Sequence, residues 1–422
     1  MDKIKIGMIG LGTVGTGVLK TLSAFKQIEI VKIAVKNLNK KRDINLSKSV
    51  LTDNPYEVVD NPDIQIVIEV VGGVEPAFDL IQTAIKNGKH IVTANKELLA
   101  KHGEELFSFA EKHNKVILYE AAIAGGIPII MPIKTILTGN KITKIAAILN
   151  GTTNYILTKM DVDGASYQNV LSEAQELGYA ETDPTGDVEG FDAAYKIATL
   201  STIAFNKRIN IKNIYREGIT KIQAEDMKYA SEFGFKIKLI ALAQLDENDN
   251  ADVRVHPMLV KKTKSLAHID YVTNAIMLDG HPMGEIMFSG AGAGEFPTAS
   301  SIVGDVLAIA TELKTTDYPL PMMRCHHGEA AKMIDISQTY NRYYLSINVK
   351  NNVGVIASLG KSFAENEISV SSLLQKGLMS DNTANIIVIT ESCNEQNLQN
   401  AIKILKNDSC INKINSLIRV ME

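Results

Sequence analysis

The segment Gly10-Leu11-Gly12-Thr13-Val14-Gly15 constrains the fold of this chain more than any other. An apolar strand pattern over residues 3–9 precedes it, and a helical pattern over residues 16–25 follows it. In this context the first glycine permits a tight turn, the second lets the backbone approach a pyrophosphate, and the third lets helix and strand pack closely. The N-terminus of the helix adds N–H groups and partial positive charge. The segment therefore predicts a dinucleotide site, and the alternative is a glycine-rich turn that binds no ligand.

Strands and helices alternate in the rest of the N-terminal part. Strands are predicted at residues 28–35, 65–71, 90–93 and 116–120, and helices at residues 76–87 and 101–113. Gly88 is placed to end the first of these helices. Such alternation is typical of a parallel sheet with helices on both faces. We therefore expect a Rossmann-type domain over residues 1–130, with residues 297–320 packing back onto it.

Longer strands follow in the central part of the chain. They are predicted at residues 144–149, 235–244, 251–259 and 271–278, with helices at residues 154–160, 166–177 and 190–204. Asp279-Gly280 between two apolar runs predicts a hairpin turn. Consecutive long strands joined by turns indicate an antiparallel or mixed sheet. Residues 131–296 are therefore predicted to form an α+β catalytic and dimerisation domain.

The C-terminal part has a third pattern, which begins after a predicted linker at residues 321–342. Strands at residues 343–349, 368–376, 384–390 and 414–420 are combined with helices at residues 353–366 and 395–407. Their order, βαββαβ, is that of a compact ferredoxin-like unit. We therefore predict an α/β protein in which residues 343–422 form a separate C-terminal domain.

Composition excludes several classes of protein. A net charge of −4 without a concentrated basic face makes nucleic acid an unexpected partner. No segment reaches the ~18 apolar residues of a membrane span, and the first residues lack the apolar core of a signal peptide. Cys325, Cys393 and Cys410 form no CxxC pair, so reduced thiols in a cytoplasmic protein are expected. Cys325-His326-His327, without further ligands, is more typical of a structural cluster than of a metal site.

The residues after the second strand bear on the choice of dinucleotide. A carboxylate at this position usually binds the ribose hydroxyls of NAD. This chain has Lys36 instead, followed by Lys40-Lys41-Arg42. These cations favour the 2′-phosphate of NADP over NAD, and the alternative is a solvated basic surface. Thr93 and Lys96 follow another strand, at the carboxyl edge where such sheets bind ligands; a lysine that opens a helix is otherwise commonly exposed.

The most specific segment spans residues 174–196, AQELGYAETDPTGDVEGFDAAYK. It holds Lys196 and five carboxylates, which are Glu181, Asp183, Asp187, Glu189 and Asp192. Asp192 and Lys196 are four residues apart on a predicted helix and share a face. Alanine-rich surroundings indicate that this helix is buried, and a buried lysine is paired or has a lowered pKa. Either state suits proton exchange with an alcohol or carbonyl oxygen; the alternative is an ordinary surface ion pair.

This segment resembles the signature of the homoserine dehydrogenase family. The matching positions are Ala174, Gly178, Asp183, Pro184, Asp187, Val188, Gly190, Asp192 and Lys196. Residues 120–128, 150–157, 289–294 and 297–300 resemble further segments of the family, and the resemblance extends over residues 4–315. It implies an NAD(P)-dependent enzyme that reversibly reduces L-aspartate 4-semialdehyde to L-homoserine in the biosynthesis of threonine, methionine and isoleucine.

The resemblance also implies roles for individual residues. Lys196 matches the lysine that exchanges a proton with the substrate oxygen, Lys96 a second active-site lysine, and Asp192 the acidic partner in the same pocket. The substrate-binding positions are Glu181 and Asp187, which hold the ammonium group, and Gly151 and Thr152, which line the pocket. The resemblance adds cofactor contacts at Thr13, Val14 and Gly294. With Lys96 and the residues named above, the predicted cofactor-binding positions are Gly10, Gly12, Thr13, Val14, Gly15, Lys36, Thr93, Lys96 and Gly294.

A cation site is implied in the same way. Glu120, Ile123, Gly125 and Ile127 match positions that bind sodium, mostly through carbonyl oxygens, which hard cations prefer. Residue types and spacing alone would not indicate this site, and the alternative is a glycine-rich turn.

Residues 343–422 resemble an ACT domain, an amino-acid sensor of biosynthetic enzymes. The usual Asp-x-Pro-Gly turn after its first strand is replaced by Lys350-Asn351-Asn352-Val353-Gly354, in which only the glycine is kept. The resemblance implies feedback inhibition by L-threonine, and the alternative is a domain that only dimerises. A homodimer or homotetramer is expected.

Two other functions were weighed against the dehydrogenase. A catalytically silent, amino-acid-responsive regulator would lack Lys196 or the carboxylates, and all of them are present. A different nicotinamide oxidoreductase of the same architecture does not explain the spacing from Asp183 to Lys196. The dehydrogenase is therefore the function that we predict.

Overall fold

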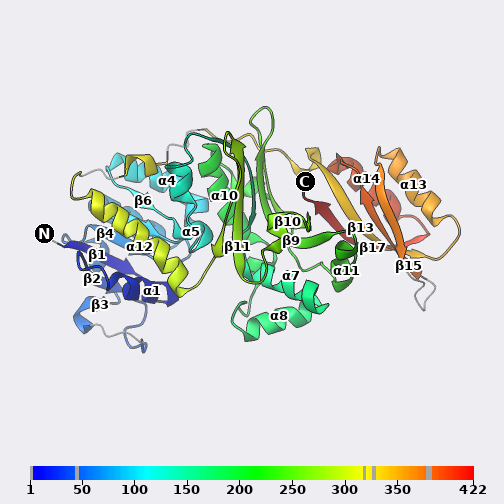
Figure 1. Ribbon diagram of the computed structural model, residues 1–422. Helices are drawn as coiled ribbons and strands as arrows, with labels where there is room; N and C mark the ends of the chain where they lie inside the picture. The colour runs from blue at the N-terminus through cyan, green and yellow to red at the C-terminus, as the bar shows by residue number, and fades with distance from the viewer. Residues whose placement is uncertain (1–2, 43–46, 317–319, 326–328, 377–382) are drawn as a thin grey trace. The chain divides into compact units, whose positions relative to one another are not determined.

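The structure is a computed structural model (Figure 1) that describes residues 3–42, 47–316, 320–325, 329–376 and 383–422. The chain divides into two compact units. The first unit comprises Met1–Ile145, Tyr195–Lys212 and Thr273–Ala331, and the second Ala146–Ala194, Asn213–Val272 and Lys332–Glu422. The chain passes from one unit to the other within β7 (Lys141–Ile148) and within α10 (Phe191–Phe205). The domain boundaries given above stay predictions, and His326 and His327 lie outside the described residues.

A parallel sheet forms the centre of the first unit. Its strands are β1 (Ile4–Ile9), β2 (Ile28–Ala34), β3 (Leu51–Thr52), β4 (Ile66–Glu69), β5 (His90–Thr93) and β6 (Ile117–Leu118). They lie in the order β3-β2-β1-β4-β5-β6, with every neighbouring pair parallel. This is the strand order of a Rossmann-type sheet, so that prediction is confirmed. The sequence pattern missed β3 because two residues carry no recognisable period.

Helices from distant parts of the sequence also belong to this unit. They are α1 (Thr13–Leu22), α2 (Tyr56–Val59), α3 (Ala77–Lys86), α4 (Lys96–Lys112), α5 (Ala121–Ala124), α6 (Ile130–Lys134) and α12 (Glu295–Glu312). α12 packs beside α1 (Figure 1), and Gly17 permits the contact because an added Cβ would lie 2.5 Å from the carbonyl oxygen of Glu295. The same pair of helices is joined by Lys20 Nζ and Glu295 Oε1 at 2.9 Å.

The predicted hairpin exists, but its turn lies later than the sequence indicates. β11 (Thr273–His281) and β12 (Gly284–Ala291) pair in antiparallel fashion, with Asp279 opposite Glu285 and Gly280 opposite Gly284. The Asp279-Gly280 prediction is therefore wrong. Glycine is required at position 280 for another reason: an added Cβ would lie only 2.6 Å from the carbonyl oxygen of Lys141. Gly284, with φ +71°, resumes the strand after the turn.

The second unit combines helices with long antiparallel strands and a short parallel strand. The helices are α7 (Gly151–Asp163), α8 (Tyr167–Glu176), α9 (Thr185–Val188) and α11 (Ala224–Glu232), and the strands are β8 (Tyr215–Arg216), β9 (Phe235–Leu245) and β10 (Ala251–Lys261). β9 and β10 pair along their whole length. Polar side chains begin the helices: Asn150 accepts from Thr153 N at α7, and Ser166 from Asn169 N at α8.

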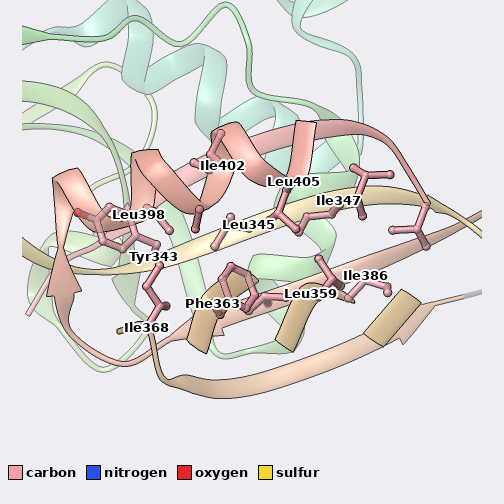
Figure 2. Close-up of a cluster of buried hydrophobic side chains, with 14 of the residues drawn as sticks. Tyr343, Leu345, Ile347, Leu359, Phe363, Ile368, Ile386, Leu398, Ile402 and Leu405 are labelled. Carbon is pink, nitrogen blue, oxygen red and sulfur yellow. The ribbon is translucent and has the colours of Figure 1, made fainter. Parts of the chain in front are cut away.

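The C-terminal part of this unit has the predicted βαββαβ order. Its elements are β13 (Tyr340–Lys350), α13 (Val355–Glu365), β14 (Val370–Lys376), β15 (Thr383–Thr390), a short β16 (Cys393–Asn394), α14 (Glu395–Lys406) and β17 (Ile411–Val420). The strand order β17-β13-β15-β14 is antiparallel throughout. Figure 2 shows side chains of both helices, such as Phe363 and Leu398, packing against Tyr343 and Leu345 of β13.

The last strand links this domain to the rest of the second unit. β17 pairs in parallel with β10 through Met258–Arg419 and Leu259–Val420, and the N–H of Met421 donates to the carbonyl oxygen of Leu259 at 2.9 Å. One sheet therefore runs from β9 through β10 and β17 into β13. Within the described part of the chain, no helix has the length and apolar character that a membrane span requires.

Candidate functional site

The glycine segment of the first unit forms an open turn before α1. Gly10 has φ +104°, and an added Cβ would lie 2.8 Å from the carbonyl oxygen of Val70. Gly15 approaches Gly10 so closely that its Cβ would lie 2.5 Å from the carbonyl oxygen. Gly12 begins α1 without a side-chain cap, and nothing in the described structure lies within 4 Å of the position of its Cβ. The uncapped N–H groups that start at Thr13 and Val14, and the open space beside Gly12, fit the pyrophosphate of a dinucleotide.

Glu69 organises the carboxyl edge of the sheet beside this turn. It is fully buried at the end of β4 and accepts hydrogen bonds from the Thr93 hydroxyl at 2.6 Å and from Val71 N at 2.8 Å. Asn95 begins α4 by accepting from Leu98 N, and its amide donates to the carbonyl oxygen of Gly73 at 2.6 Å. Glu69 was not among the predicted site residues, although a carboxylate that ends an otherwise apolar strand was a usable signal.

The basic residues after β2 lie in a loop shaped by Arg42. Its guanidinium donates to the carbonyl oxygens of Asn37 at 2.8 Å and Lys40 at 3.0 Å. Lys36, Lys40 and Lys41 are exposed. The Arg42 guanidinium is therefore engaged in hydrogen bonds within its own loop, whereas these lysines face solvent beside the sheet edge.

Asn150 brings two of the predicted carboxylates together in the second unit. Its amide nitrogen donates to Asp187 Oδ1 at 2.7 Å and to Asp192 Oδ2 at 3.0 Å. Its amide oxygen accepts from Thr153 N at 2.8 Å, so the start of α7 fixes its orientation. Asn150 and Asp192 are buried, with 5% and 7% of their surface exposed. Sequence reasoning did not select Asn150, since its partners lie about forty residues further along the chain.

The other predicted residues of the second unit lie around this pair. Gly151 starts α7, where a Cβ would lie 3.0 Å from the carbonyl oxygen of Val272. The Thr152 hydroxyl donates to the carbonyl oxygen of Tyr179 at 2.7 Å. Glu181 is exposed, whereas Asn150 and Asp192 are buried.

Asp183 has a local task. It accepts from Thr185 N at 3.1 Å, and the hydroxyl and N–H of Thr185 lower the pKa of its carboxyl group. The ionised side chain therefore stabilises the start of α9, which carries Asp187.

The two predicted lysines belong to the first unit. Lys196 lies on α10, where 8% of its surface is exposed and Ile197 and Ala198 are also buried. The expectation of a buried lysine on a buried helix is confirmed. Lys96 is the first residue of α4 and is partly buried, directly after the carboxyl edge of β5.

Glu120 uses its carboxylate to hold the start of α6. Oε1 accepts from Ile129 N at 2.5 Å and Ile130 N at 2.7 Å, and Oε2 accepts from Met131 N at 2.7 Å. Both oxygens are thus engaged with the main chain. Nearby, burial raises the pKa of Asp305 well above its usual value, although the hydrogen bond from Glu120 N opposes this shift.

Main-chain oxygens remain as the means by which this segment could hold a cation. Gly125 turns the chain after α5 with φ +58°, and the Ser301 hydroxyl donates to its carbonyl oxygen at 2.7 Å. No cluster of three or more histidine, cysteine, aspartate or glutamate side chains suited to a metal occurs in the described part of the chain. A carbonyl site for a hard monovalent ion would need no such cluster.

Comparison with known proteins establishes the family. Residues 128–307 match the family model of homoserine dehydrogenase, and residues 10–120 match that of the homoserine dehydrogenase NAD-binding domain. A homoserine dehydrogenase of Synechocystis sp. is 41% identical over 431 residues, which cover 99% of this chain and 99% of that protein. The chain belongs to the homoserine dehydrogenase family.

Solved structures of homoserine dehydrogenases agree with this assignment. That of Thiobacillus denitrificans matches with a TM-score of 0.94 at 38% identity, over 100% of this chain and 99% of that chain. A hyperthermophilic archaeal homoserine dehydrogenase, solved in complex with NADPH, matches with a TM-score of 0.62 at 26% identity. The match covers 74% of this chain and 99% of the archaeal one. The protein is an NAD(P)-dependent oxidoreductase that acts on a CH–OH group, and the predicted enzyme class is confirmed.

Proposed function

We propose that this protein is a cytoplasmic homoserine dehydrogenase that reversibly reduces L-aspartate 4-semialdehyde to L-homoserine for threonine, methionine and isoleucine biosynthesis. The observation that carries the proposal is the pair of carboxylates, Asp187 and Asp192, joined by Asn150. An amino-acid substrate presents an ammonium group, and charge-assisted hydrogen bonds to carboxylates are the strong way to bind it. A simple aldehyde or alcohol would need no such pair.

Each proposed residue has a chemical task. A bound nicotinamide cofactor would supply the hydride chemistry at the carbonyl carbon in either direction. Lys196 donates a proton to the carbonyl oxygen during reduction and stabilises the developing alkoxide, while the reverse reaction returns the proton to its amine. We assign the second lysine role, beside cofactor and substrate, to Lys96, which opens α4 after the carboxyl edge of the sheet. Asp187 binds the ammonium group. Asp192 accepts from the same amide nitrogen of Asn150 and so adds negative charge beside Asp187.

The remaining cofactor-binding and substrate-binding residues differ in how their side chains and main chain are engaged. The Thr93 hydroxyl donates a hydrogen bond to Glu69, so we propose that Thr93 contacts the cofactor through its main chain. Gly294 begins α12 with φ +118°, which suits a close approach of main chain and cofactor. Gly151 and Thr152 line the substrate pocket at the start of α7. Glu181, being exposed, is the weaker of the two proposed ammonium ligands.

We propose NADP as the preferred cofactor, because Lys36 stands where NAD-dependent enzymes usually have a carboxylate. The archaeal relative that was solved with NADPH is compatible with this choice. With the semialdehyde as substrate, NADPH is expected to give the higher kcat/KM. Lys36→Glu should reduce that preference by about tenfold, since a charge-assisted contact to the 2′-phosphate is replaced by repulsion.

Steady-state kinetics with both cofactors measure this effect, and Lys86→Glu on the exposed end of α3 serves as a charge-matched control. Equal preference in the wild type, or an unchanged preference in Lys36→Glu, would show that these lysines are only solvated surface. Absence of turnover with the semialdehyde and either cofactor would instead refute the proposed function itself.

We further propose that sodium binds the carbonyl oxygens of the segment from Glu120 to Ile127, as Ile123, Gly125 and Ile127 suggest. The Glu120 side chain would then fix the position of this segment without binding the ion itself, because both of its oxygens accept hydrogen bonds from the main chain at the start of α6.

We also propose a homodimer or homotetramer. β12 is a terminal strand with 38% of Met287 exposed, and such an edge invites pairing with another copy.

We propose that the C-terminal domain is an ACT domain through which L-threonine inhibits the enzyme. A pocket of about 370 Å³ lies at the end of β13 and the start of α13, lined among others by Lys350, Asn352, Gly354 and Gln375. The family model ends at residue 307, so this domain lies outside the part that defines the activity. Polar groups and the N-terminus of α13 suit the carboxylate and hydroxyl of a small amino acid.

L-threonine is therefore expected to inhibit the wild type, and Asn352→Ala should raise the half-inhibitory concentration by about tenfold, the effect of losing one ligand hydrogen bond. Inhibition curves at fixed substrate test this, with Asn407→Ala, on the exposed end of α14, as the control. An uninhibited wild type, or an unchanged curve for Asn352→Ala, would leave the domain with a dimerising role only.

A further inference from the structure

Residues 215–220 of the second unit, which we name the clamp segment, contact both the carboxylate-bearing turn and the C-terminal strand. The segment begins with β8, which pairs in parallel with β10, and the N–H of Glu217 continues this pairing by donating to the carbonyl oxygen of Val255 at 2.8 Å. Its second half lies against Val188 and Glu189, which stand between Asp187 and Asp192 in the sequence. The clamp segment is therefore fixed to the sheet and touches the turn that carries both substrate carboxylates.

Hydrogen bonds hold the turn against the clamp segment. The N–H of Ile219 donates to the carbonyl oxygen of Val188 at 2.8 Å. The Thr220 hydroxyl donates to Glu189 Oε1 at 3.0 Å. Gly218 makes this approach possible, because a Cβ there would overlap the carbonyl oxygen of Val188. Main chain and side chain of the turn are thus both engaged, directly after Asp187.

Arg216 holds the other end of the same turn. Its guanidinium donates to the carbonyl oxygen of Glu189 and lies over the ring of Phe191, 3.4 Å from the centroid. Phe191 is the first residue of α10 and immediately precedes Asp192. Gly190 has φ +78°, and its Cβ would lie 3.4 Å from Arg216 Cγ, so the turn has little room to move. The positions of Asp187 and Asp192 therefore depend on contacts that neither carboxylate makes itself.

Arg419 of β17 holds the clamp segment from the C-terminal domain. Nε and Nη2 each donate to one oxygen of Glu395 at 2.9 Å, and Nη1 donates to Glu217 Oε1 at 3.1 Å. The Tyr215 hydroxyl accepts from Nη2 at 3.2 Å and donates to Glu217, while its ring lies 4.9 Å from the guanidinium. Only 1% of the Arg419 side chain is exposed. Because a buried guanidinium is strongly destabilised when a partner is lost, this pairing resists rearrangement.

We propose that the clamp segment positions the Asp187–Asp192 turn for the substrate ammonium, and that Arg419 holds the clamp segment so that the C-terminal domain sets substrate affinity. The proposal rests on the substrate-binding role of the two carboxylates given above. Arg216 and Glu217 are positioning residues, since they act on the substrate through the turn. A change in the C-terminal domain that displaces β17 would reach the carboxylates by way of Arg419 and the clamp segment, which holds Val188 and Glu189.

The variant Glu217→Gln tests this link, because it keeps the shape of the side chain while removing the charge that Arg419 binds. We expect the KM for L-homoserine to rise about tenfold, with kcat and the KM for NADP within about twofold of the wild type. We also expect faster hydrogen exchange of the Ile219 amide, which is bonded to Val188 and reports directly on the clamp segment.

Glu365→Gln is the matched control, since Glu365 pairs with Lys361 on the exposed surface of α13 in the same domain. It should change neither KM nor the exchange of Ile219. An unchanged KM for homoserine in Glu217→Gln, with or without faster exchange, would overturn the proposal. So would an equal rise in both KM values, because a merely structural role gives no selectivity for the amino-acid substrate.

Two measurements separate a failure of this proposal from a failure of the proposed function. Wild-type turnover of the semialdehyde and a raised homoserine KM in Asp187→Asn test the function without involving the clamp segment. If both hold and Glu217→Gln behaves as wild type, the clamp proposal alone is wrong. If wild-type turnover is absent, the proposed function is wrong, and the clamp proposal falls with it.

Discussion

Replacement of Lys196 by methionine is expected to lower kcat by about 10²–10⁴-fold, the usual contribution of a positioned proton donor. Methionine keeps the length and apolar stem of the side chain on the buried α10 helix but cannot donate a proton or stabilise an alkoxide. Because the loss of a buried charge leaves its partners unpaired and lowers the stability of the fold, the folding of the variant is checked separately. Steady-state and single-turnover kinetics in both directions measure the effect, and circular dichroism confirms that the variant is folded.

Lys228→Met is the appropriate control for this prediction. Lys228 is also a helical lysine, but it lies exposed on α11. Its replacement should leave kcat and both KM values near those of the wild type. A folded Lys196→Met enzyme with near-normal kcat would refute the proton-transfer role, and Lys96 would become the residue to test next.

Asp187→Asn is expected to raise the KM for L-homoserine by about 10–100-fold, because a charged hydrogen bond to the substrate ammonium is lost. The kcat should change much less, since an interaction that binds substrate and transition state equally acts on KM. The substitution is nearly isosteric, and the new amide oxygen can still accept from Asn150, as Asp187 Oδ1 does at 2.7 Å. The KM for NADP should stay unchanged, as the residue lies outside the glycine turn of the first unit.

Two further carboxylates serve as comparisons for Asp187. Glu176→Gln, on the exposed end of α8, should be silent. Glu181→Gln should have a smaller effect than Asp187→Asn, because Glu181 is exposed, whereas Asp187 accepts a hydrogen bond from Asn150. A homoserine KM that is more sensitive to Glu181→Gln than to Asp187→Asn would reverse the proposed roles of these two side chains.

Local sequence patterns determined most of the elements of this protein. The Rossmann-type sheet and the βαββαβ order were predictable because periodicity, glycine turns and helix caps act over a few residues. β5 was predicted residue for residue, while β3 and the short β8 escaped because two residues show no period. The Asp279-Gly280 turn failed because a close approach to Lys141 also requires glycine there. A local pattern cannot distinguish these two uses of the residue.

The sequence by itself determined which segments carry the chemistry: the glycine turn, the residues from Asp183 to Lys196, and the order of strands and helices around them. Only the tertiary structure decided that Asn150 joins Asp187 to Asp192, that Glu69 orders the sheet edge, and that Arg419 reaches Glu217. These contacts join residues that are distant along the chain. They depend on strand register and on the packing of side chains in three dimensions, neither of which a short stretch of sequence encodes.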